Sequence, residues 1–250
     1  MYFMIAVLII IIVFAGAFYI VNKKDKNKQS RKQPQTNTKK TKTTSNKSEI
    51  DPGCVFTEKE LNSYIDPKTP AELVKYSIPP SFSILDNHTL RNCTNLTELY
   101  IHDKMFLLEN NSFINCVNLI NINVHEDNKN YCSKLGVLFA KESRDIICYP
   151  SAKQSSTYFI PQEVEKIDNH AFTNNKFLKY IILPNTVTTI CENAFVNCKL
   201  LKQIVIPDTV TTIHPRAFNM CPRLSIRGYK GSVAEQYCKK YFIPFEYLTK

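Results

Sequence analysis

The chain has 250 residues, including 32 Lys and Arg, 22 Asp and Glu and nine Cys, and its formal net charge is +10. Ten of the basic residues but only two acidic ones lie between residues 22 and 49. The remainder is close to neutral, so the overall charge does not indicate nucleic-acid binding. The cysteines include no Cys-x-x-Cys pair, which argues against a zinc knuckle, and five Gly residues provide little material for a phosphate-binding loop.

Residues 2–21 form an uncharged run rich in Ile and Val. As a helix this run would be about 30 Å long, which is the thickness of a bilayer core. The sequence therefore predicts a single transmembrane anchor or uncleaved signal. A cleaved signal peptide is the alternative, because Ala15-Gly16-Ala17 resembles a cleavage site. No basic region precedes the run, however, and the run continues to Val21, which favours the anchor.

Residues 22–50 form a basic tract of Lys, Asn, Gln, Thr and Ser, with no aliphatic or aromatic residue before position 50. Such a composition buries too little apolar surface to offset its ordering entropy, so we expect a disordered linker. A polybasic tract beside a membrane is attracted to anionic lipid headgroups, which makes lipid contact one interpretation. A plain solvated spacer is the other.

Residues 51–77 are predicted to form an N-terminal cap with two short helices. Thr57 and Glu60 have the spacing of a capping box, which predicts a helix that covers Leu61 and Ile65. The segment from Pro70 to Val74 is interpreted as the start of the second helix.

From about residue 78 the chain repeats itself every 23 residues. This spacing relates three or more positions in each of several sets: Phe172, Phe195 and Phe218; Ile167, Ile190 and Ile213; Leu178, Leu201 and Leu224. A fixed period of this length indicates a solenoid, in which each unit buries its apolar face against its neighbours. We predict degenerate repeats at 78–124, an insert at 125–159 and three regular repeats at 160–226.

Within one repeat, the alternation of Ile204 and Ile206 predicts a strand that ends at Pro207, because proline cannot donate to a ladder. Ala217-Phe218 then opens a short helical or irregular corner. Stacked coils would place the Phe residues in an inner spine and the strands in parallel sheets. The predicted fold is thus a mainly β solenoid with short helical or irregular corners, preceded by a transmembrane helix and a disordered linker.

The insert and the C-terminal end depart from this pattern. Two apolar runs around the charged segment 141–145 predict a β-hairpin within residues 125–159. Residues 227–250 are predicted to form a C-terminal cap, in which Ser232 and Glu235 have capping-box spacing at the start of an amphipathic helix.

Four cysteines share one repeat slot: Cys93, Cys116, Cys198 and Cys221. In this slot they are expected to behave as small, buried apolar residues with free thiols. Disulfides between neighbouring coils are the alternative, because stacked coils lie within disulfide reach.

The unit resembles the repeat of the BspA-like leucine-rich repeat family, which reads approximately I-P-x-x-V-x-x-I-x-x-x-A-F-x-x-C-x-x-L-x-x-I-x-I-P. The match is strong from Pro161, Pro184 and Pro207 onward, and weaker from Pro79, where Leu90 replaces the Phe. The insert, with its Gly-Val-Leu-Phe and Tyr-Pro elements, and the C-terminal segment also resemble parts of that family. The resemblance covers about residues 76–250 and implies a leucine-rich repeat solenoid.

The predicted anchor and the repeat array together indicate a non-catalytic, membrane-anchored protein, and the resemblance implies a role in adhesion, with a protein or a cell-surface or matrix macromolecule as its partner. The alternative is an intracellular scaffold tethered to a membrane; an enzyme is a distant third. No catalytic residue, cofactor or nucleic-acid partner is predicted. Two orientation signals disagree, because Lys23, Lys24, Lys26 and Lys28 after the anchor favour a cytosolic domain, whereas the family favours the outside.

The outward positions of the Leu-x-x-Ile-x-Ile strand are the predicted partner-binding face, because exposed Tyr and aliphatic residues suit protein contact. The residues proposed for it are Tyr100, Asn123, Tyr180, Ile182, Gln203 and Val205. His102 and His125 also share a slot, and two stacked imidazoles could share a metal ion. A polar turn at the usual position of the Pro is the favoured interpretation of this pair.

Overall fold

The computed structural model describes residues 55–64, 74–109 and 111–249. Every described residue belongs to one compact unit, which spans residues 49–250. The predicted anchor at 2–21 and the linker at 22–50 lie outside the described residues. Within the described ranges, no helix is long and apolar enough to cross a bilayer.

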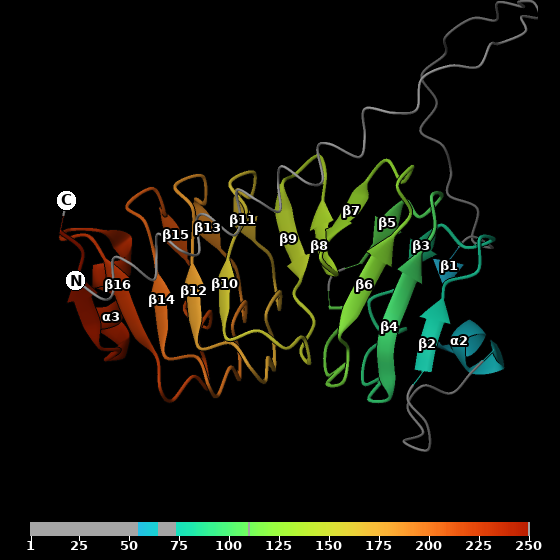
Figure 1. Cartoon of the computed structure of the whole chain (residues 1–250), viewed down its shortest axis with the longest axis horizontal. Helices are drawn as coiled ribbons and strands as arrows, with labels where there is room; N and C mark the ends of the chain where they lie inside the picture. The colour runs from blue at the N-terminus through green and yellow to red at the C-terminus, as the bar shows by residue number, and fades with distance from the viewer. Residues whose placement is uncertain (1–54, 65–73, 110, 250) are drawn as a thin grey trace, which may run out of the picture. The chain divides into compact units, whose positions relative to one another are not determined.

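This unit is a solenoid whose coils each give one strand to each of two sides, as predicted (Figure 1). On one side are a three-stranded and a five-stranded parallel sheet: β2 (Val74–Ser77), β4 (Leu96–Ile101) and β6 (Asn121–Val124), then β10 (Thr157–Phe159), β12 (Tyr180–Ile182), β14 (Gln203–Val205), β16 (Ser225–Gly228) and β17 (Phe245–Tyr247).

The other side also has two sheets, built from shorter strands. One contains β1 (Val55–Phe56), β3 (Ile84–Leu85) and β5 (Leu107–Leu108). The other has six strands in the order β15 (Thr212–Ile213), β13 (Thr189–Ile190), β11 (Lys166–Ile167), β9 (Asp145–Cys148), β8 (Val137–Ala140) and β7 (Tyr131–Lys134). Both sides are therefore interrupted where the insert enters the stack.

Residues that are 23 apart in the sequence pair with each other in the parallel sheets. Ile167 pairs with Ile190, and Ile190 pairs with Ile213, so equivalent residues of successive coils lie side by side. The predicted Phe spine is confirmed: the ring centroids of Phe172 and Phe195 are 4.8 Å apart and those of Phe195 and Phe218 are 5.0 Å apart. All three rings are buried.

The insert contains the predicted hairpin, formed by β8 and β9, and a third antiparallel strand, β7, beside it. β8 and β9 enclose the charged turn as expected, and β7 adds a strand that the sequence interpretation missed. Leu135 and Gly136 join β7 to β8 with φ of 51° and 77°, the left-handed pair of a tight type I′ turn. Gly136 is required there because a Cβ would lie 2.2 Å from the Asn121 side chain.

Strand β9 takes the place of a missing coil. It pairs with β11 in parallel, Ile146 beside Ile167, and the Tyr149 ring that follows stacks on Phe172 at 5.2 Å. The insert also joins two core clusters. Val137 and Ile146 pack in the C-terminal cluster, whereas Leu138 packs in the N-terminal one. Its sheet is thus buried on both faces.

A ladder of asparagine side chains crosses the insert at one corner of the coils. The Asn115 amide donates to Asn92 Oδ1 (2.9 Å), Asn174 donates to Asn115 (2.8 Å), and Asn197 donates to Asn174 (2.6 Å). All four residues have φ between 59° and 63°. Asparagine tolerates this left-handed backbone better than other non-glycine residues, which explains its recurrence at the slot.

The slot cysteines point inward beside this ladder. Cys116, Cys198 and Cys221 each direct the thiol to a backbone oxygen of the preceding coil, at 2.9–3.1 Å. Asn175 replaces cysteine in one coil and donates to Pro150 O instead. The eight cysteines within the described ranges are free thiols.

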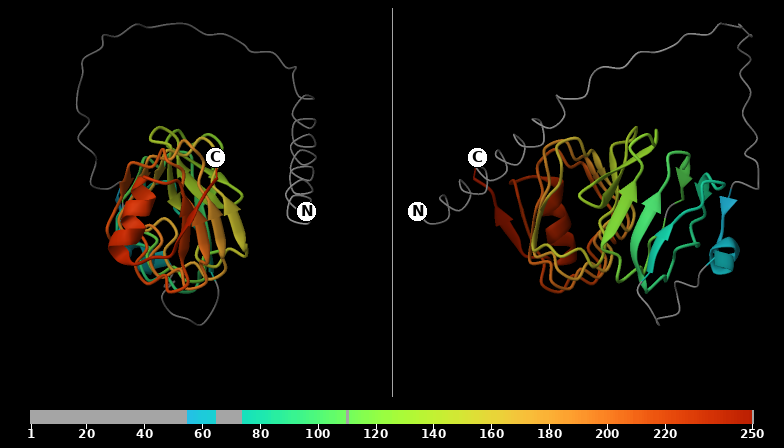
Figure 2. Two further views of the ribbon diagram at one scale, coloured as in Figure 1. Left: turned by 90° about the vertical axis from the view of Figure 1, so that its left-hand side faces the viewer. Right: turned by 45° about the vertical axis from the view of Figure 1, so that its right-hand side comes forward.

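The two ends of the stack are covered by the predicted caps, α2 (Glu58–Tyr64) and α3 (Val233–Tyr241) (Figures 1 and 2). Ser232 Oγ accepts from Glu235 N at 3.3 Å, which confirms the C-terminal capping box. The predicted start of a second helix at 70–74 is wrong at Val74, which is the first residue of β2; residues 70–73 lie outside the described ranges. Pairing of β2 with β4 outweighs the local helix signal because it adds Tyr76 to the core.

Candidate functional site

The predicted partner-binding residues lie on the outer face of the longer strands. Tyr100 and Tyr180 are each 41% exposed, and Asn123, Ile182, Gln203 and Val205 are half-buried. Their inward neighbours on the same strands, such as Leu99, Ile181 and Ile204, are buried. The strand alternation read from the sequence therefore describes which side chains point outward.

The face is not one continuous strip, which corrects the expectation that stacking would align all six residues. Tyr100 and Asn123 belong to the sheet β2-β4-β6, whereas the other four belong to the sheet that starts at β10. The insert separates the two sheets because β7 and β8 occupy the space beside β6. A partner on this face meets two distinct patches.

Phe159 is a further residue of the C-terminal patch that the sequence interpretation missed. It is 56% exposed on β10, and it pairs in register with Ile182, which pairs with Val205. The three side chains form one apolar row across adjacent strands. Phe159 lies 23 residues before Ile182, so the repeat period could have placed Phe159 on this face. The predicted insert at 125–159 included Phe159 instead.

His102 and His125 each form part of a polar turn, as the favoured interpretation expected. Nδ1 of His102 accepts from Lys104 N at 3.1 Å, and Nδ1 of His125 accepts from Asp127 N at 3.3 Å. Each ring is used to fix the turn that follows its strand. In the ranges that the structure describes, no group of three or more His, Cys, Asp or Glu side chains is arranged to hold a metal ion.

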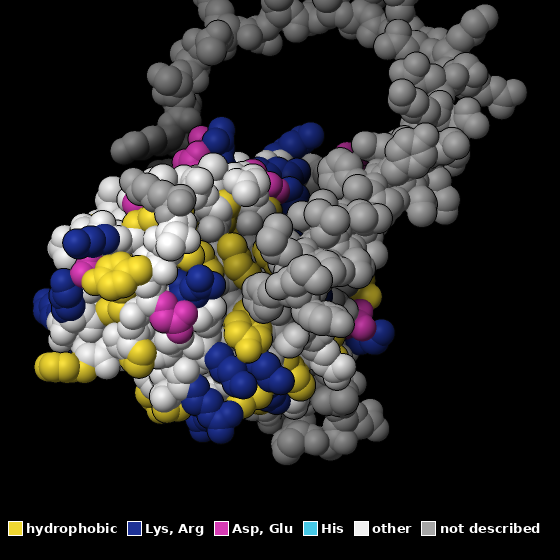
Figure 3. Space-filling model, turned by 60° about the vertical axis from the view of Figure 1, so that its left-hand side comes forward, with side chains coloured by type: hydrophobic (Ala, Val, Ile, Leu, Met, Phe, Trp, Pro, Cys, Tyr) yellow, Lys and Arg dark blue, Asp and Glu magenta, His cyan; other side chains and the backbone are white. Residues whose placement is uncertain are grey.

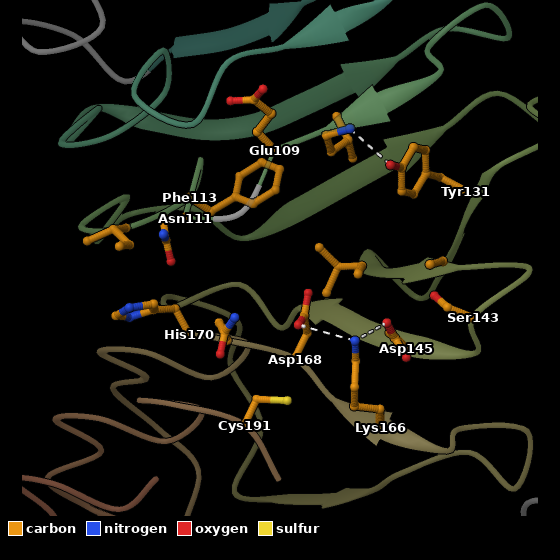
Figure 4. A pocket seen from close by; sticks show the side chains of 15 residues that line it. Glu109, Asn111, Phe113, Tyr131, Ser143, Asp145, Lys166, Asp168, His170 and Cys191 are labelled. Atoms are coloured by element: carbon orange, nitrogen blue, oxygen red, sulfur yellow. Dashed lines mark hydrogen bonds and ion pairs between the residues drawn. The ribbon is translucent and has the colours of Figure 1, made fainter. Parts of the chain in front are cut away.

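A polar pocket of about 310 Å³ lies where the insert interrupts the shorter strands (Figure 4). It is bounded on one side by the end of β5 with Glu109, Asn111, Phe113 and Ile114, and on the other by β9, β11 and the turn after β11. Tyr131 closes one wall, since its hydroxyl accepts from Leu108 N at 2.9 Å. The titratable groups that line the pocket are Glu109, Tyr131, Asp145, Lys166, Asp168, His170 and Cys191.

Lys166 lies between two buried carboxylates. Its Nζ is 2.7 Å from Asp145 and 3.6 Å from Asp168. Burial alone would lower the pKa of Lys166, but the hydrogen bond to Asp145 and the nearby charge of Asp168 raise it above its ordinary value. The ammonium is therefore held in its charged form, and it neutralises part of the acidic charge of the pocket. The sequence interpretation found no such acidic pair.

Cys191 and His170, also in this pocket, are kept in their neutral forms. Burial raises the pKa of the Cys191 thiol, although the charge of Lys166 opposes it. Burial also lowers the pKa of His170, whose Nδ1 lies 3.1 Å from Thr173 Oγ1. A protonated thiol is a weak nucleophile, so this arrangement describes a charge-compensated polar junction rather than an activated cysteine. The His170 side chain is half-buried.

Comparison with solved structures supports the fold. A leucine-rich repeat protein from Eubacterium ventriosum ATCC 27560 is 25% identical, with a TM-score of 0.56 over 63% of this chain and 42% of that chain. The pneumococcal vaccine antigen PcpA is also 25% identical, with a TM-score of 0.50 over 60% of this chain and 44% of its own. This chain therefore spans less than half the length of either solved chain.

A search of curated proteins finds no match. The family model described as the BspA type leucine rich repeat region matches in six copies, over residues 60–135 and 147–234. The gap between these two ranges coincides with β8 and the turn that follows it. The family model and the Eubacterium ventriosum protein are both described as leucine-rich repeats. The chain belongs to the BspA type leucine-rich repeat family.

Proposed function

We propose that this chain is a non-catalytic, membrane-anchored binding protein whose partner docks on the outer face of β10, β12 and β14. The supporting observation is the apolar row of Phe159, Ile182 and Val205 beside the exposed ring of Tyr180. The exposed ring of Phe159 and the half-buried Ile182 and Val205 gain nothing by facing water, and aromatic anchors with apolar neighbours supply much of the energy of protein interfaces.

The scaffold supports such a role because it holds the row rigidly. Each of the three residues is fixed by parallel pairing on its strand, and each inward neighbour is packed in the core. A partner would then lose little free energy to ordering of these side chains. A protein or a cell-surface or matrix macromolecule is the proposed partner, in an adhesive role.

The binding test is a comparison of variants of the same chain. Phe159→Ser, Ile182→Ser and Val205→Ser together should abolish capture of matrix proteins and attachment to cells, with the thermal melt retained. Tyr100→Ser with Asn123→Ser on the separate N-terminal patch is the matched control, and it should change capture less. Full capture by the triple variant at an unchanged melting temperature would refute this surface.

The anchor and its orientation form the second part of the proposal. Residues 2–21 would hold the chain in a membrane with the solenoid outside the cell, a placement favoured by its likeness to a vaccine antigen. The basic residues after the anchor favour the alternative, a membrane-tethered scaffold on the cytosolic side. Protease treatment of intact cells distinguishes the two, since only an outward domain would be digested without lysis.

A further inference from the structure

The C-terminal half of the solenoid carries a basic edge. Four equivalent stretches of successive coils, residues 149–159, 172–182, 195–205 and 218–228, contain no Asp or Glu. We define the basic edge as the positive residues at the corners that precede β10, β12, β14 and β16: Lys153, Lys176, Lys179, Lys199, Lys202 and Arg223. All except the half-buried Lys153 are exposed. Figure 3 shows basic side chains, with apolar ones among them, along the lower edge of its face.

The stacking of the coils sets the spacing of these charges. Lys176 and Lys199 share one slot, and Lys179 and Lys202 share another, 23 residues apart. Lys202 N donates to Lys179 O at 2.8 Å, which fixes the second pair in adjacent coils. Neighbouring parallel strands lie about 5 Å apart, so the edge presents short rows of positive charge at that interval.

These charges are not neutralised within the described part of the chain, where none of the six forms an ion pair with a carboxylate. The acidic residues of the same coils lie at other corners, where Glu165 pairs with Arg144 and Glu192 pairs with Arg216. Lys176 does bond to Asn118 Oδ1 at 3.1 Å, but that partner is neutral. Adjacent like charges repel, and an anionic ligand would relieve this repulsion.

Two grooves lie along the basic edge, the first beside Lys176 and Lys199 and the second beside Lys179, and each combines apolar surface with a few polar side chains. One, of about 550 Å³, is lined by amides of the asparagine ladder, where Asn197 Oδ1 has no hydrogen-bond partner. The other, of about 350 Å³, is lined by Gln154, two serines and the 37% exposed ring of Phe177. Amides and hydroxyls between positive charges are suited to a ligand with hydroxyls between negative groups.

We propose that the basic edge binds an anionic polysaccharide that bears sulfate or carboxylate groups. Ammonium groups would contact the anionic substituents, the amide-lined grooves would contact hydroxyls, and Phe177 would offer an apolar face to a sugar ring. A nucleic acid fits less well, since single strands need successive aromatic platforms, and the exposed rings beside these lysines, Phe177 and Tyr180, both belong to one coil. The basic edge shares no residue with the apolar row of Phe159, Ile182 and Val205. The polysaccharide proposal can therefore be tested independently of the proposed partner face.

The test uses the full chain in detergent and a heparin decasaccharide as the probe. Lys176→Gln, Lys179→Gln, Lys199→Gln and Lys202→Gln together should weaken binding roughly tenfold or more and reduce the slope of log K against log salt by about 3. The matched control removes four charges from the linker, Lys39→Gln, Lys40→Gln, Lys42→Gln and Lys47→Gln. It should retain most of the affinity, and circular dichroism should show both variants folded.

Three results would overturn the proposal. The first is an equal or greater loss in the linker variant, which would assign binding to the basic tract. The second is tighter binding to phosphatidylserine vesicles or to single-stranded DNA than to the decasaccharide at equal ionic strength. The third is wild-type binding that does not depend on salt, a measurement that needs no variant.

Discussion

The two halves of this solenoid solve the same packing problem with different side chains. In the C-terminal half, one slot builds a continuous aromatic stack of Tyr149, Phe172, Phe195 and Phe218, and Tyr237 of α3 contacts the last ring edge-on. In the described residues of the N-terminal half, ring contacts are confined to Phe56, Tyr76 and Phe82 near the cap. The corresponding slot holds the buried Leu90 and the half-buried Phe113.

This difference shows what a regular repeat adds. Identical slots let every coil pack against its neighbour in the same way, so stability is close to a sum of equal nearest-neighbour terms. The N-terminal half lacks this regularity and relies on a mixed core of Leu, Met and Cys, with α2 at its end. The insert joins the halves because each of its faces completes one core.

The largest expected loss of stability comes from truncating a Phe of the spine, and the loss should differ between the two halves. Phe195 is fully buried between two stacked rings, so Phe195→Ala should destabilise the fold by about 3 to 5 kcal/mol in a denaturant titration. Phe113→Ala, at the equivalent position of the N-terminal half, should cost about half as much because that ring is only half-buried. Equal losses would show that the two slots contribute alike, and the contrast would not hold.

The junction between the halves provides the second prediction. Lys166→Met removes the cation that faces Asp145 and Asp168, and should destabilise by about 2 kcal/mol, less than for a fully buried pair because the Lys166 side chain is 36% exposed. Lys134→Met, whose partner Glu163 is 50% exposed, should cost about 0.5 kcal/mol or less.

A rescue variant checks the cause of the Lys166 effect. Adding Asp145→Asn and Asp168→Asn to Lys166→Met removes the two buried charges that the substitution leaves unpaired, and should recover much of the lost stability. If the triple variant is less stable than Lys166→Met alone, the loss comes from packing of the lysine stem rather than from charge.

The third prediction concerns pH and the C-terminal end. The ion pair with Lys239 (2.7 Å), together with bonds from Gly231 N and Tyr247 Oη, lowers the pKa of Glu235 to about 2 from an ordinary value of 4.5. The fold thus favours the ionised carboxylate. Its contribution is complete above about pH 4.5 and is lost as the pH falls towards 2.

Hydrogen exchange of the α3 amides across this window measures the effect. Protection of α3 should fall between pH 4.5 and 2 relative to the inner coils, after correction for intrinsic exchange. Glu235→Gln should flatten this dependence, whereas Glu142→Gln, at an exposed turn of the insert, should leave it unchanged. A dependence on pH that survives in Glu235→Gln would assign it to another group.

The sequence allowed prediction of the features that follow from the period. The register of Ile167, Ile190 and Ile213, the spine of Phe172, Phe195 and Phe218, and the C-terminal cap were all readable, because a solenoid places equal slots side by side. The outward alternation of the long strands followed from the same regularity.

The polar pocket could not be predicted because the insert breaks that period. Asp145 pairs with Lys166, only 21 residues further along, so no repeat relation connects them. Tyr149 stacks on Phe172 and so extends the spine. This position holds Tyr where the regular repeats have Phe, so the sequence pattern did not indicate that the insert contributes to a coil. Strand β7 has one buried residue, Tyr131, and a pattern of four residues is too short to indicate a strand without its partner.

The asparagine ladder offers the smallest but most specific test of the regular half. The ladder ends at Asn197, and the next equivalent residue is Met220, with φ of 61° and a 68% exposed side chain. A methionine in this left-handed conformation is strained, and it leaves the buried Asn197 Oδ1 without a donor. An asparagine would tolerate the backbone, and its amide could extend the ladder by one step.

Met220→Asn should therefore stabilise the C-terminal half by about 1 kcal/mol, from the backbone preference and one more hydrogen bond. Met220→Gly supplies the backbone freedom without the amide, so it should recover only part of that gain. Met220→Gln supplies an amide without the preference for positive φ, and should gain nothing. Denaturant midpoints of the three variants separate the two causes. If the Gly and Asn variants are equally stable, the unpartnered oxygen contributes no strain and the ladder is a consequence of turn geometry alone.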